Sequence, residues 1–525
     1  MINNSITIAT HSDTTHSIVR HPRGLYVCFF TEMWERFSFY GLKALLIFYL
    51  TEHFLFSDKE ATQIFGNFFA LVYALPLLGG LIADRYLGYK KAVIFGGVLL
   101  CFGHLGMAFE GTLAYINDAG IKVESTGLTA FYVSLSFIIV GIGFLKPNIS
   151  TIVGQLYSTN DPRKDAGFTL FYMGINLGAA LAAIICGYVG RQYGWHYGFG
   201  LAGIGMLIGL CIFILNQRHL TKASENKTTP KKIKPQRLGK VKVTHLVYLA
   251  AFALITFISL CVSNHQIVGS LLGFTLIIAS LGLIIYCLYE KSQSVKRHLY
   301  AALSLIMMST VFFLCFLQSG SSMNLFAERI TDRTLLGIDI PSPMFQSLNA
   351  IFIILMAPVF SKLWLTLNEH NKAPSTPAKF AIGLFLVGLG FAALLLGLYF
   401  SHQHDPVAMI WLIIAYFLHT LGELCISPIG LSMITKLSTP KMAGLMMGLW
   451  FLGSAIAEYI AAFLAGSAGD IATQTTRLVE GTTATLTQHQ MFTSLYTDIM
   501  WIAFIGAAVT LLLTPLIKHW MGDID

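Results

Sequence analysis

The sequence predicts an all-α membrane protein whose chain crosses the bilayer fourteen times. Hydrophobic residues make up 55% of its 525 residues and charged residues only 11%, with a mean hydropathy of +0.68. A soluble domain carries about 25% charged residues, so this composition favours the bilayer. Fourteen apolar stretches are long enough to cross it, which takes about 20 helical residues.

Twelve of these stretches carry polar residues on one face or lie between charged loops. They are residues 24–51, 62–83, 92–112, 128–155, 166–190, 196–215, 298–327, 343–367, 378–401, 406–435, 442–467 and 494–517. Two further stretches, 244–262 and 267–289, contain no Asp, Glu, Lys or Arg. Because these two offer no polar groups to a pathway, we expect them to face lipid. Residues 1–19 lack an apolar core, so the first span itself is expected to direct insertion.

Lysine and arginine residues set the expected orientation, because cytoplasmic loops retain them. With the N-terminus inside, 25 of the 34 basic residues fall on the cytoplasmic side, six on the opposite side and three within spans. We therefore expect a multi-pass protein of the cell membrane with both termini in the cytoplasm. That orientation requires an even number of spans, in agreement with fourteen.

Residues 216–243 form a Lys-, Thr- and Pro-rich segment with nine basic residues, which account for much of the net charge of +8. This pattern indicates a flexible cytoplasmic linker. The segment has no interleaved aromatic residues, so we expect no nucleic-acid partner and favour contact with anionic lipid headgroups. All eight cysteines lie in apolar spans without Cys-x-x-Cys spacing, which indicates core residues rather than disulfides or metal ligands.

The first span carries charged residues inside an apolar run that could cross the bilayer. An ionised group near the bilayer centre costs at least about 2.5 to 3.5 kcal/mol, so such groups must be paired or hydrated. On a helix they form one polar stripe about three turns long, made of Glu32, Glu35, Arg36, Tyr40 and Lys43. The stripe predicts a water-filled interior. The alternative is a structural Glu32–Arg36 ion pair that only joins helices.

Later spans add further polar groups to this interior. Lys146 precedes Pro147, and the kink expected at that proline would aim the lysine into the cavity. The fifth span contributes Asn176 among small residues, which could equally serve as contact between helices. In the tenth span Glu423 is an ionisable residue inside the membrane, which indicates a functional site. The structural alternative is pairing with His419, one helical turn earlier.

Two more stretches invite a structural or a functional interpretation. Residues 79–91, between the second and third spans, predict a Gly-bounded tight turn whose opposed charges latch two helices, or an ordinary charged loop. Trp450 and Phe451 predict an aromatic wall in the eleventh span. Neither stretch carries the chemistry of an enzyme.

Enzyme signatures are missing from the sequence. It contains no His-Glu-x-x-His, no Gly-x-Ser-x-Gly and no Gly-x4-Gly-Lys-Ser/Thr. We therefore expect no catalytic residues, no cofactor and no metal site. Movement of a solute is the function class that remains.

Six motifs, each on the expected span, together resemble one family. They are Glu-x-x-Glu-Arg-Phe from Glu32, Gly-Gly-x-x-Ala-Asp-Arg from Gly79, Leu-Lys-Pro-Asn from Leu145, Phe-Tyr-x-x-Ile-Asn-x-Gly from Phe171, Gln-x-Gly-Ser-Ser from Gln318 and Glu-Leu-x-x-Ser-Pro-x-Gly from Glu423. Over residues 24–467 the sequence resembles the proton-dependent oligopeptide transporters of the major facilitator superfamily, in their bacterial form. The resemblance implies the major facilitator fold, two six-helix bundles around a central cavity, with two extra helices, in an inner membrane.

The resemblance also divides the chain. It implies a cytoplasmic tail at residues 1–23, an N-terminal six-helix bundle at 24–215, the basic linker at 216–243, a two-helix insertion at 244–290, a C-terminal six-helix bundle at 298–517 and a tail at 518–525.

Proton-coupled symport of di- and tripeptides by alternating access is the function that the resemblance implies, with a single chain as the working unit. Proton coupling would involve Glu32, Glu35, Arg36, Lys146 and Glu423. Peptide would be bound by Arg36, Tyr40, Lys43, Tyr73, Lys146, Asn176, Asn349, Glu423, Ser427, Trp450 and Phe451. The cations would take the peptide carboxylate, Glu423 the amino end, the two asparagines the amide, and the aromatic residues the side chains.

This sequence departs from the family pattern at four positions. Phe39 stands where many members have tyrosine, Lys43 where they have arginine, Leu317 where many have glutamate and Phe313 where many have tryptophan. In better-known members that arginine and glutamate pair between bundles and close the extracellular side. Lys43 and Leu317 cannot form this bridge, so the outer gate must close in another way.

Two other functions stay open at this point. One is a family relative that carries another small solute such as nitrate, which Arg36, Lys43 and Lys146 could bind. Glu423 argues against it, because a carboxylate in the site would repel an anion. The other is a sensor that binds peptide without moving it.

Overall fold

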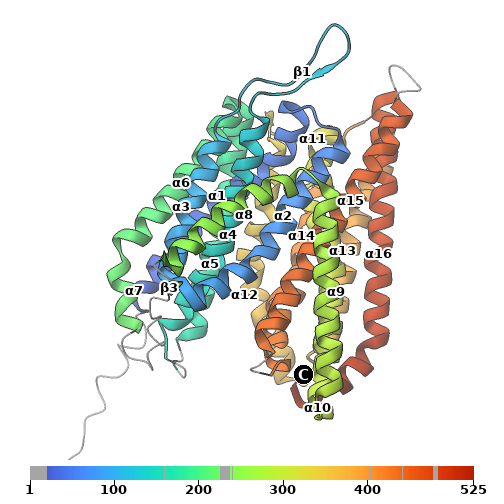
Figure 1. Cartoon of the computed structure of the whole chain (residues 1–525). Helices are drawn as coiled ribbons and strands as arrows, with labels where there is room; N and C mark the ends of the chain where they lie inside the picture. The colour runs from blue at the N-terminus through green and yellow to red at the C-terminus, as the bar shows by residue number, and fades with distance from the viewer. Residues whose placement is uncertain are drawn as a thin grey trace, which may run out of the picture.

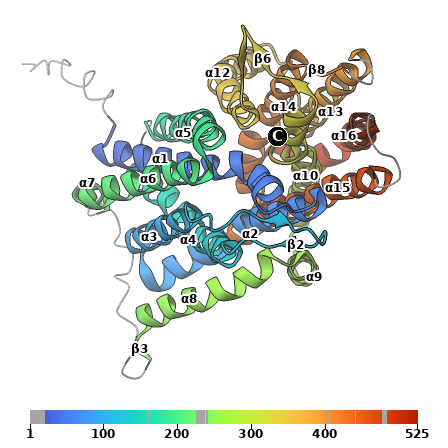
Figure 2. The ribbon, with the colours of Figure 1, turned by 90° about the horizontal axis from the view of Figure 1, so that it is seen from above.

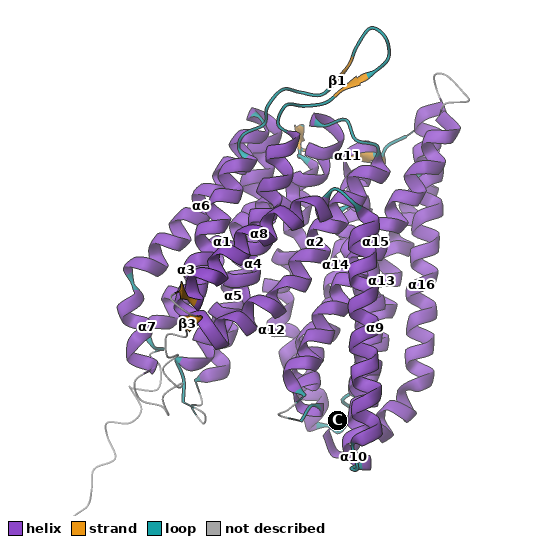
Figure 3. Ribbon diagram, in the orientation of Figure 1, coloured by secondary structure: helices purple, strands orange, loops and turns teal. Residues whose placement is uncertain are grey.

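Almost all of the described chain is helical, with only short strands (Figure 3). This computed structural model describes residues 21–158, 161, 163–224, 237–238, 241–401, 405–439, 442–476 and 483–524. Within these ranges thirteen helices are long and apolar enough to cross a membrane. Helix α1, Arg23–Phe48, is a fourteenth of spanning length, because its 26 residues extend about 39 Å.

The N-terminal bundle consists of the first six long helices. They are α1 (Arg23–Phe48), α2 (Asp58–Ile82), α3 (Tyr89–Met107), α4 (Leu128–Gln155), α5 (Lys164–Tyr193) and α6 (Trp195–Leu215). Single π-turns, η1 (Tyr49–His53) and η2 (Ala83–Leu87), extend α1 and α2. Strands β1 (Tyr115–Ile116) and β2 (Lys122–Val123) pair antiparallel between α3 and α4. We call the face that carries this pair the hairpin side.

The C-terminal bundle also consists of membrane-spanning helices. Its helices are α10 (Gln293–Phe316), η3 (Leu317–Gly320), α11 (Ser322–Arg329), η4 (Ser342–Gln346), α12 (Ser347–Glu369), α13 (Thr376–Phe400), α14 (Met409–Leu437), α15 (Ala443–Thr476), α16 (Thr483–Met521) and η5 (Gly522–Ile524). Its first span is interrupted by a 3₁₀ turn, η3, between α10 and α11. Strands β5 (Thr331–Asp332) and β8 (Val407–Ala408) pair in parallel, and β6 (Thr334–Leu335) pairs antiparallel with β7 (Ile338–Asp339). Helix α16 continues past residue 517, into the segment expected to be a tail.

Between the bundles the described residues form three helices. Helix α7 (Gln217–Ser224) occupies the start of the expected linker, and β3 (Arg237–Leu238) pairs with β4 (Val241–Lys242) near its end. The middle of that linker, 225–236, and the N-terminal tail up to residue 20 lie outside the described residues. Helices α8 (Val243–Val262) and α9 (His265–Tyr289) form the insertion. We call the face that carries this linker the linker side.

The two bundles stand side by side, with α8 and α9 at the periphery (Figures 1 and 2). They meet mainly along α2 and α15, and again where α5 faces α12. A Cβ at Gly448 would lie 3.1 Å from Leu77 Cδ2, and one at Gly466 would lie 3.0 Å from Thr62 Oγ1. Helices α2 and α15 are therefore in contact near both ends of α2.

The insertion is attached to this seam between the bundles. Asn67 of α2 donates through Nδ2 to the carbonyl oxygen of Val262 at 3.0 Å, and its Oδ1 lies 2.8 Å from His265 Nδ1. The His265 ring stacks on Tyr459 of α15, with ring centroids 4.0 Å apart. The turn between α8 and α9 thus contacts one helix of each bundle, although most of α9 is exposed to lipid.

Close packing of α2 on α4 explains the Gly79-Gly80 pair. A side chain at Gly79 would clash with the carbonyl oxygen of Gly143, the acceptor that Pro147 leaves without its helical partner. Both glycines lie inside α2, so the expectation that they bound a tight turn is wrong. The turn ends instead at Gly88, whose φ of 78° favours glycine.

Candidate functional site

The first part of the polar stripe on α1, from Glu32 to Arg36, is buried and internally paired. Arg36 donates through Nη2 to Glu35 Oε1 at 2.6 Å and through Nε to Glu35 Oε2. Arg36 Nε also lies 3.4 Å from Glu32 Oε1. Glu32 Oε2 is buried and has no hydrogen-bond partner among the described residues. Glu35 and Arg36 therefore form a fixed pair, while Glu32 keeps one oxygen that can take a proton.

Packing on the far side of α1 turns this stripe toward the interior. Thr31 donates to the carbonyl oxygen of Gly209 in α6 at 3.4 Å, and α5 approaches so closely that a side chain at Gly178 would clash with the carbonyl oxygen of Met33. The Arg36 guanidinium lies 4.8 Å from the ring centroid of Phe39, a favourable cation–π geometry. Two glycine-rich helices thus fix where the stripe points.

Lys146 of α4 completes the cluster of charges. Its Nζ lies 5.4 Å from the ring centroid of Tyr73 on α2. Arg36, Glu35 and Glu32 are the charged groups that act on it. The structure thus brings Lys146 near enough to the Glu32, Glu35 and Arg36 group of α1 for their charges to interact.

The C-terminal bundle contributes a carboxylate held by amide and hydroxyl groups. Asn349 of α12 donates through Nδ2 to Glu423 Oε2 at 2.9 Å and to Thr420 Oγ1 at 3.1 Å. His419, the alternative partner of Glu423, packs instead against Phe391, with ring centroids 4.8 Å apart. Because Asn349 satisfies only one carboxylate oxygen in this contact, Glu423 can still accept from a ligand.

Tyr40 and Asn176 lie where the two halves of the site meet. Tyr40 is half-buried, and the charges that act on its hydroxyl come from Arg36 and both glutamates of α1 and from Glu423 of α14. Asn176 donates to the carbonyl oxygen of Tyr172 in its own helix at 3.0 Å. Close by, alanines of α5 and α12 pack against each other and against Tyr40.

Of the two aromatic residues expected to form a wall, Trp450 is buried and Phe451 is half-buried. Trp450 is 4% exposed, its ring fills the space beside Gly430, and its centroid lies 6.4 Å from that of Phe313. Phe451 packs against the hydrophobic core. Ser427 Oγ is buried without a hydrogen-bond partner in the described part of the chain.

A cleft of about 790 Å³ lies between the bundles toward the linker side. Thr169 and Tyr172 of α5, Pro358 and Trp364 of α12, and Pro428 and Lys436 of α14 are among its lining residues. Two of its lining residues neighbour expected site residues: Pro428 follows Ser427 in the chain, and the carbonyl oxygen of Tyr172 accepts from Asn176. The cleft therefore reaches from the linker side to the helix turns that carry these two residues.

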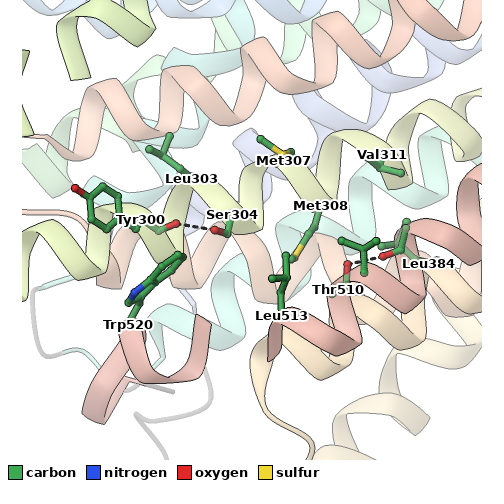
Figure 4. Close-up of a pocket in the computed structure, with 12 residues that line it drawn as sticks. Tyr300, Leu303, Ser304, Met307, Met308, Val311, Leu384, Thr510, Leu513 and Trp520 are labelled. Atoms are coloured by element: carbon green, nitrogen blue, oxygen red, sulfur yellow. Dashed lines mark hydrogen bonds between the residues drawn. The ribbon is translucent and has the colours of Figure 1, made fainter. Parts of the chain in front are cut away.

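A second pocket, of about 340 Å³, has a different character (Figure 4). It lies between α10, α13 and α16, and its lining is almost wholly apolar, including Leu303, Met307 and Leu513. The hydroxyls of Ser304 and Thr510 are bonded to carbonyl oxygens of their own helices. This pocket suits an acyl chain and offers nothing to a charged solute.

Ion pairs close the hairpin side. Arg329 of α11 donates to both carboxylate oxygens of Asp58 of α2 at 2.5 and 2.6 Å. Arg191 of α5 joins Glu52, at 2.6 and 2.7 Å, to Glu328 of α11, at 2.7 Å. Between described residues, every ion pair that links the two bundles is on this side. Sequence reasoning missed these pairs because they join helix ends far apart in the chain.

Glu458 of α15 is a further buried carboxylate that sequence reasoning missed. It is 2% exposed, and Lys43 is the charged group that acts on it. The signal was present, because Glu458 is an acidic residue inside an apolar span and such residues are rarely structural.

The sequence model of the POT family matches residues 90–480. The chain belongs to the POT family. Its relatives include the peptide transporter YePEPT of Yersinia enterocolitica, 36% identical over 478 residues that cover 87% of this chain and 90% of the relative. Dipeptide and tripeptide permease A of Chromobacterium violaceum is 31% identical over 506 residues, which cover 96% of this chain and 95% of the relative.

Solved structures agree with this membership. Peptide transporter POT in complex with sulfate superposes with a TM-score of 0.79 at 33% identity, covering 95% of this POT-family chain and 96% of the other. Tetrameric PepTSo2 superposes with a TM-score of 0.76 at 25% identity, covering 94% and 98% of the two chains. The all-α prediction, with the major facilitator fold, is confirmed.

Proposed function

We propose that the chain imports di- and tripeptides together with protons by alternating access. One observation carries the proposal: Arg36 of the N-terminal bundle and Glu423 of the C-terminal bundle both act on the hydroxyl of Tyr40, and Arg36 also acts on Lys146. Related chains are named peptide transporters or di- and tripeptide permeases. Transporters of this family are not enzymes, in agreement with the sequence.

A short peptide is a zwitterion whose ammonium and carboxylate lie a fixed distance apart. Lys146 and Arg36 would receive the carboxylate, and Glu423 the amino terminus, by charge-assisted hydrogen bonds. Asn176 and Asn349 would bond the peptide amide. Such a site binds the peptide through its backbone groups, and the peptide side chains contact only apolar surface. Peptides with different side chains can therefore bind, which gives broad specificity.

Glu32 is the proton site that the geometry favours. Both oxygens of Glu35 are bonded to Arg36, whereas Glu32 Oε2 has no partner within the described residues. An ionised Glu32 attracts Arg36 and Lys146, and its protonation frees positive charge for the peptide carboxylate. Binding of peptide and of proton are thereby linked, as symport requires.

The state seen here is closed on the hairpin side and has its cleft on the linker side. The distribution of Lys and Arg supports a cytoplasmic linker side, with both termini inside a bacterial inner membrane. In that orientation the structure is the inward-facing state, from which peptide leaves through the cleft. One chain supplies every residue of the site, which supports a monomer as the working unit.

Uptake of a labelled dipeptide into proteoliposomes, with and without an inward proton gradient, tests the proposal. We expect accumulation above the external concentration only with the gradient, and no competition from nitrate. Competition by nitrate would favour an anion carrier, and binding without uptake would favour a sensor.

A further inference from the structure

Two buried ionisable side chains, a lysine and a glutamate from opposite bundles, lie beside the seam between α2 and α15. Lys43 of α1 is 8% exposed and Glu458 of α15 is 2% exposed. Neither forms a hydrogen bond or an ion pair with another described residue. Lys43 Nζ instead lies 5.3 Å from the ring centroid of Phe69, and Glu458 Oε1 is buried without a partner. A buried charge without compensation is costly, so each needs the other.

The two groups are each other's main electrostatic neighbours. Glu458 and, less strongly, Glu423 are the carboxylates that act on Lys43. Among the described residues Lys43 is the charge that acts on Glu458. The Glu458 carboxylate also interacts electrostatically with the hydroxyl of Tyr73 on α2. In a dry interior opposite charges attract strongly even without direct contact. Because one charge belongs to each bundle, this attraction favours the closed seam.

The packing around the pair leaves little room for another partner. A Cβ at Gly66 of α2 would lie 3.2 Å from the carbonyl oxygen of Glu458, so the two helices are in close contact at this level. On the other side, a Cβ at Gly320 of η3 would lie 2.8 Å from Lys43 Cε. Residues three apart in a 3₁₀-helix share a face, so Leu317 lies on the same face as Gly320. That face offers Lys43 no carboxylate, because Leu317 is apolar.

We propose that Lys43 and Glu458 form a charge pair across the seam, which holds the hairpin side closed, and that neutralising Glu458 lets the bundles part there. The proposal deepens the proposed function, because opening of this side is what admits a solute. It gives Lys43 a positioning role in place of the peptide-binding role expected from the sequence.

Labelling of a cysteine at residue 62 measures opening directly. Thr62 is 1% exposed and lies beneath Gly466 of α15, so a membrane-impermeant maleimide reaches residue 62 only when α2 and α15 separate. In Thr62→Cys protein in nanodiscs, mass spectrometry of the peptide that contains residue 62 excludes signal from the native cysteines. We expect Glu458→Gln and Lys43→Gln each to raise the labelling rate about tenfold or more. Asp118→Asn, an exposed carboxylate in the hairpin loop, is the matched control and should leave the rate unchanged.

Two double variants separate pairing from general loosening. The double variant Lys43→Gln with Glu458→Gln should be labelled no faster than either single variant, because either substitution alone already removes the whole interaction. Leu317→Glu in the Glu458→Gln background should slow labelling again, since it returns a carboxylate to the face beside Lys43. An unchanged rate in Glu458→Gln, or additive effects together with no recovery by Leu317→Glu, overturns the proposal. No peptide is present in these measurements, so their outcome is independent of whether the protein transports peptides.

Discussion

At the scale of single residues, similar carboxylates have different surroundings. Glu35 has both oxygens bonded to Arg36, Glu32 has one buried oxygen without a described partner, and Glu423 accepts from Asn349. Sequence reasoning located all three, because an acidic residue inside an apolar span is informative by itself. It could not separate their roles, since spacing on a helix does not say which oxygen is bonded.

Replacement of Lys146 by alanine tests the cation that faces the peptide carboxylate. We expect gradient-driven uptake of a dipeptide to be lost, because Arg36 also bonds to both oxygens of Glu35 and cannot hold the peptide carboxylate alone. Lys91→Ala removes an exposed lysine at the start of α3 and should transport normally. Normal uptake by Lys146→Ala would remove Lys146 from the site.

Replacement of Glu423 by glutamine tests recognition of the amino end. A charge-assisted hydrogen bond contributes about 1.5 to 3 kcal/mol, so the preference for a free amino terminus over an N-acetylated one should fall roughly tenfold to a hundredfold. Competition of the two dipeptides against a labelled one measures this preference. Equal weakening of both would show that Glu423 does not contact the amino end.

At the scale of helices, hydropathy located the spans, and α4 has the predicted bounds of 128–155. Hydropathy does not indicate the π-turns or the packing of individual side chains. The π-turns after α1 and α2 shift backbone hydrogen bonds by one residue without a change of composition. The burial of Trp450 against Gly430 depends on which helices are neighbours, which a single sequence does not show.

Removal of the Asn67 side chain tests how the insertion is attached. Asn67→Ala deletes the bonds from α2 to Val262 and His265, each of which contributes about 1 kcal/mol. Hydrogen exchange of the amides at residues 262–266 should accelerate roughly fivefold or more. Ser263→Ala is the control in the same turn, because its hydroxyl bonds only to Leu260 of its own helix.

At the scale of the whole molecule, two bundles are joined on one side by charges and separated on the other by a cleft. The Asp58–Arg329 and Arg191–Glu328 pairs cross the interface on the hairpin side. These pairs explain how this side closes although Leu317 provides no carboxylate for Lys43. A change of state must break them, so they set part of the balance between open and closed forms.

Replacement of Arg329 by glutamine should shift that balance. Spin labels at residues 112 and 338, exposed positions on the hairpin side of opposite bundles, report the separation by electron resonance. We expect a longer distance to become populated in Arg329→Gln. Arg333→Gln is the matched control, because Arg333 pairs with Glu328 and Asp339 of its own bundle. The account of closure fails if both variants give the wild-type distances.

The central claim is that a proton on Glu32 drives peptide accumulation, and Glu32→Gln tests it most directly. Proteoliposomes that contain this variant are compared with wild type in two assays on the same labelled dipeptide. One assay is accumulation driven by an imposed inward proton gradient, and the other is exchange against unlabelled peptide inside. Glutamine mimics the permanently protonated form, so we predict that accumulation is lost and exchange persists. Accumulation as strong as that of wild type would contradict the account.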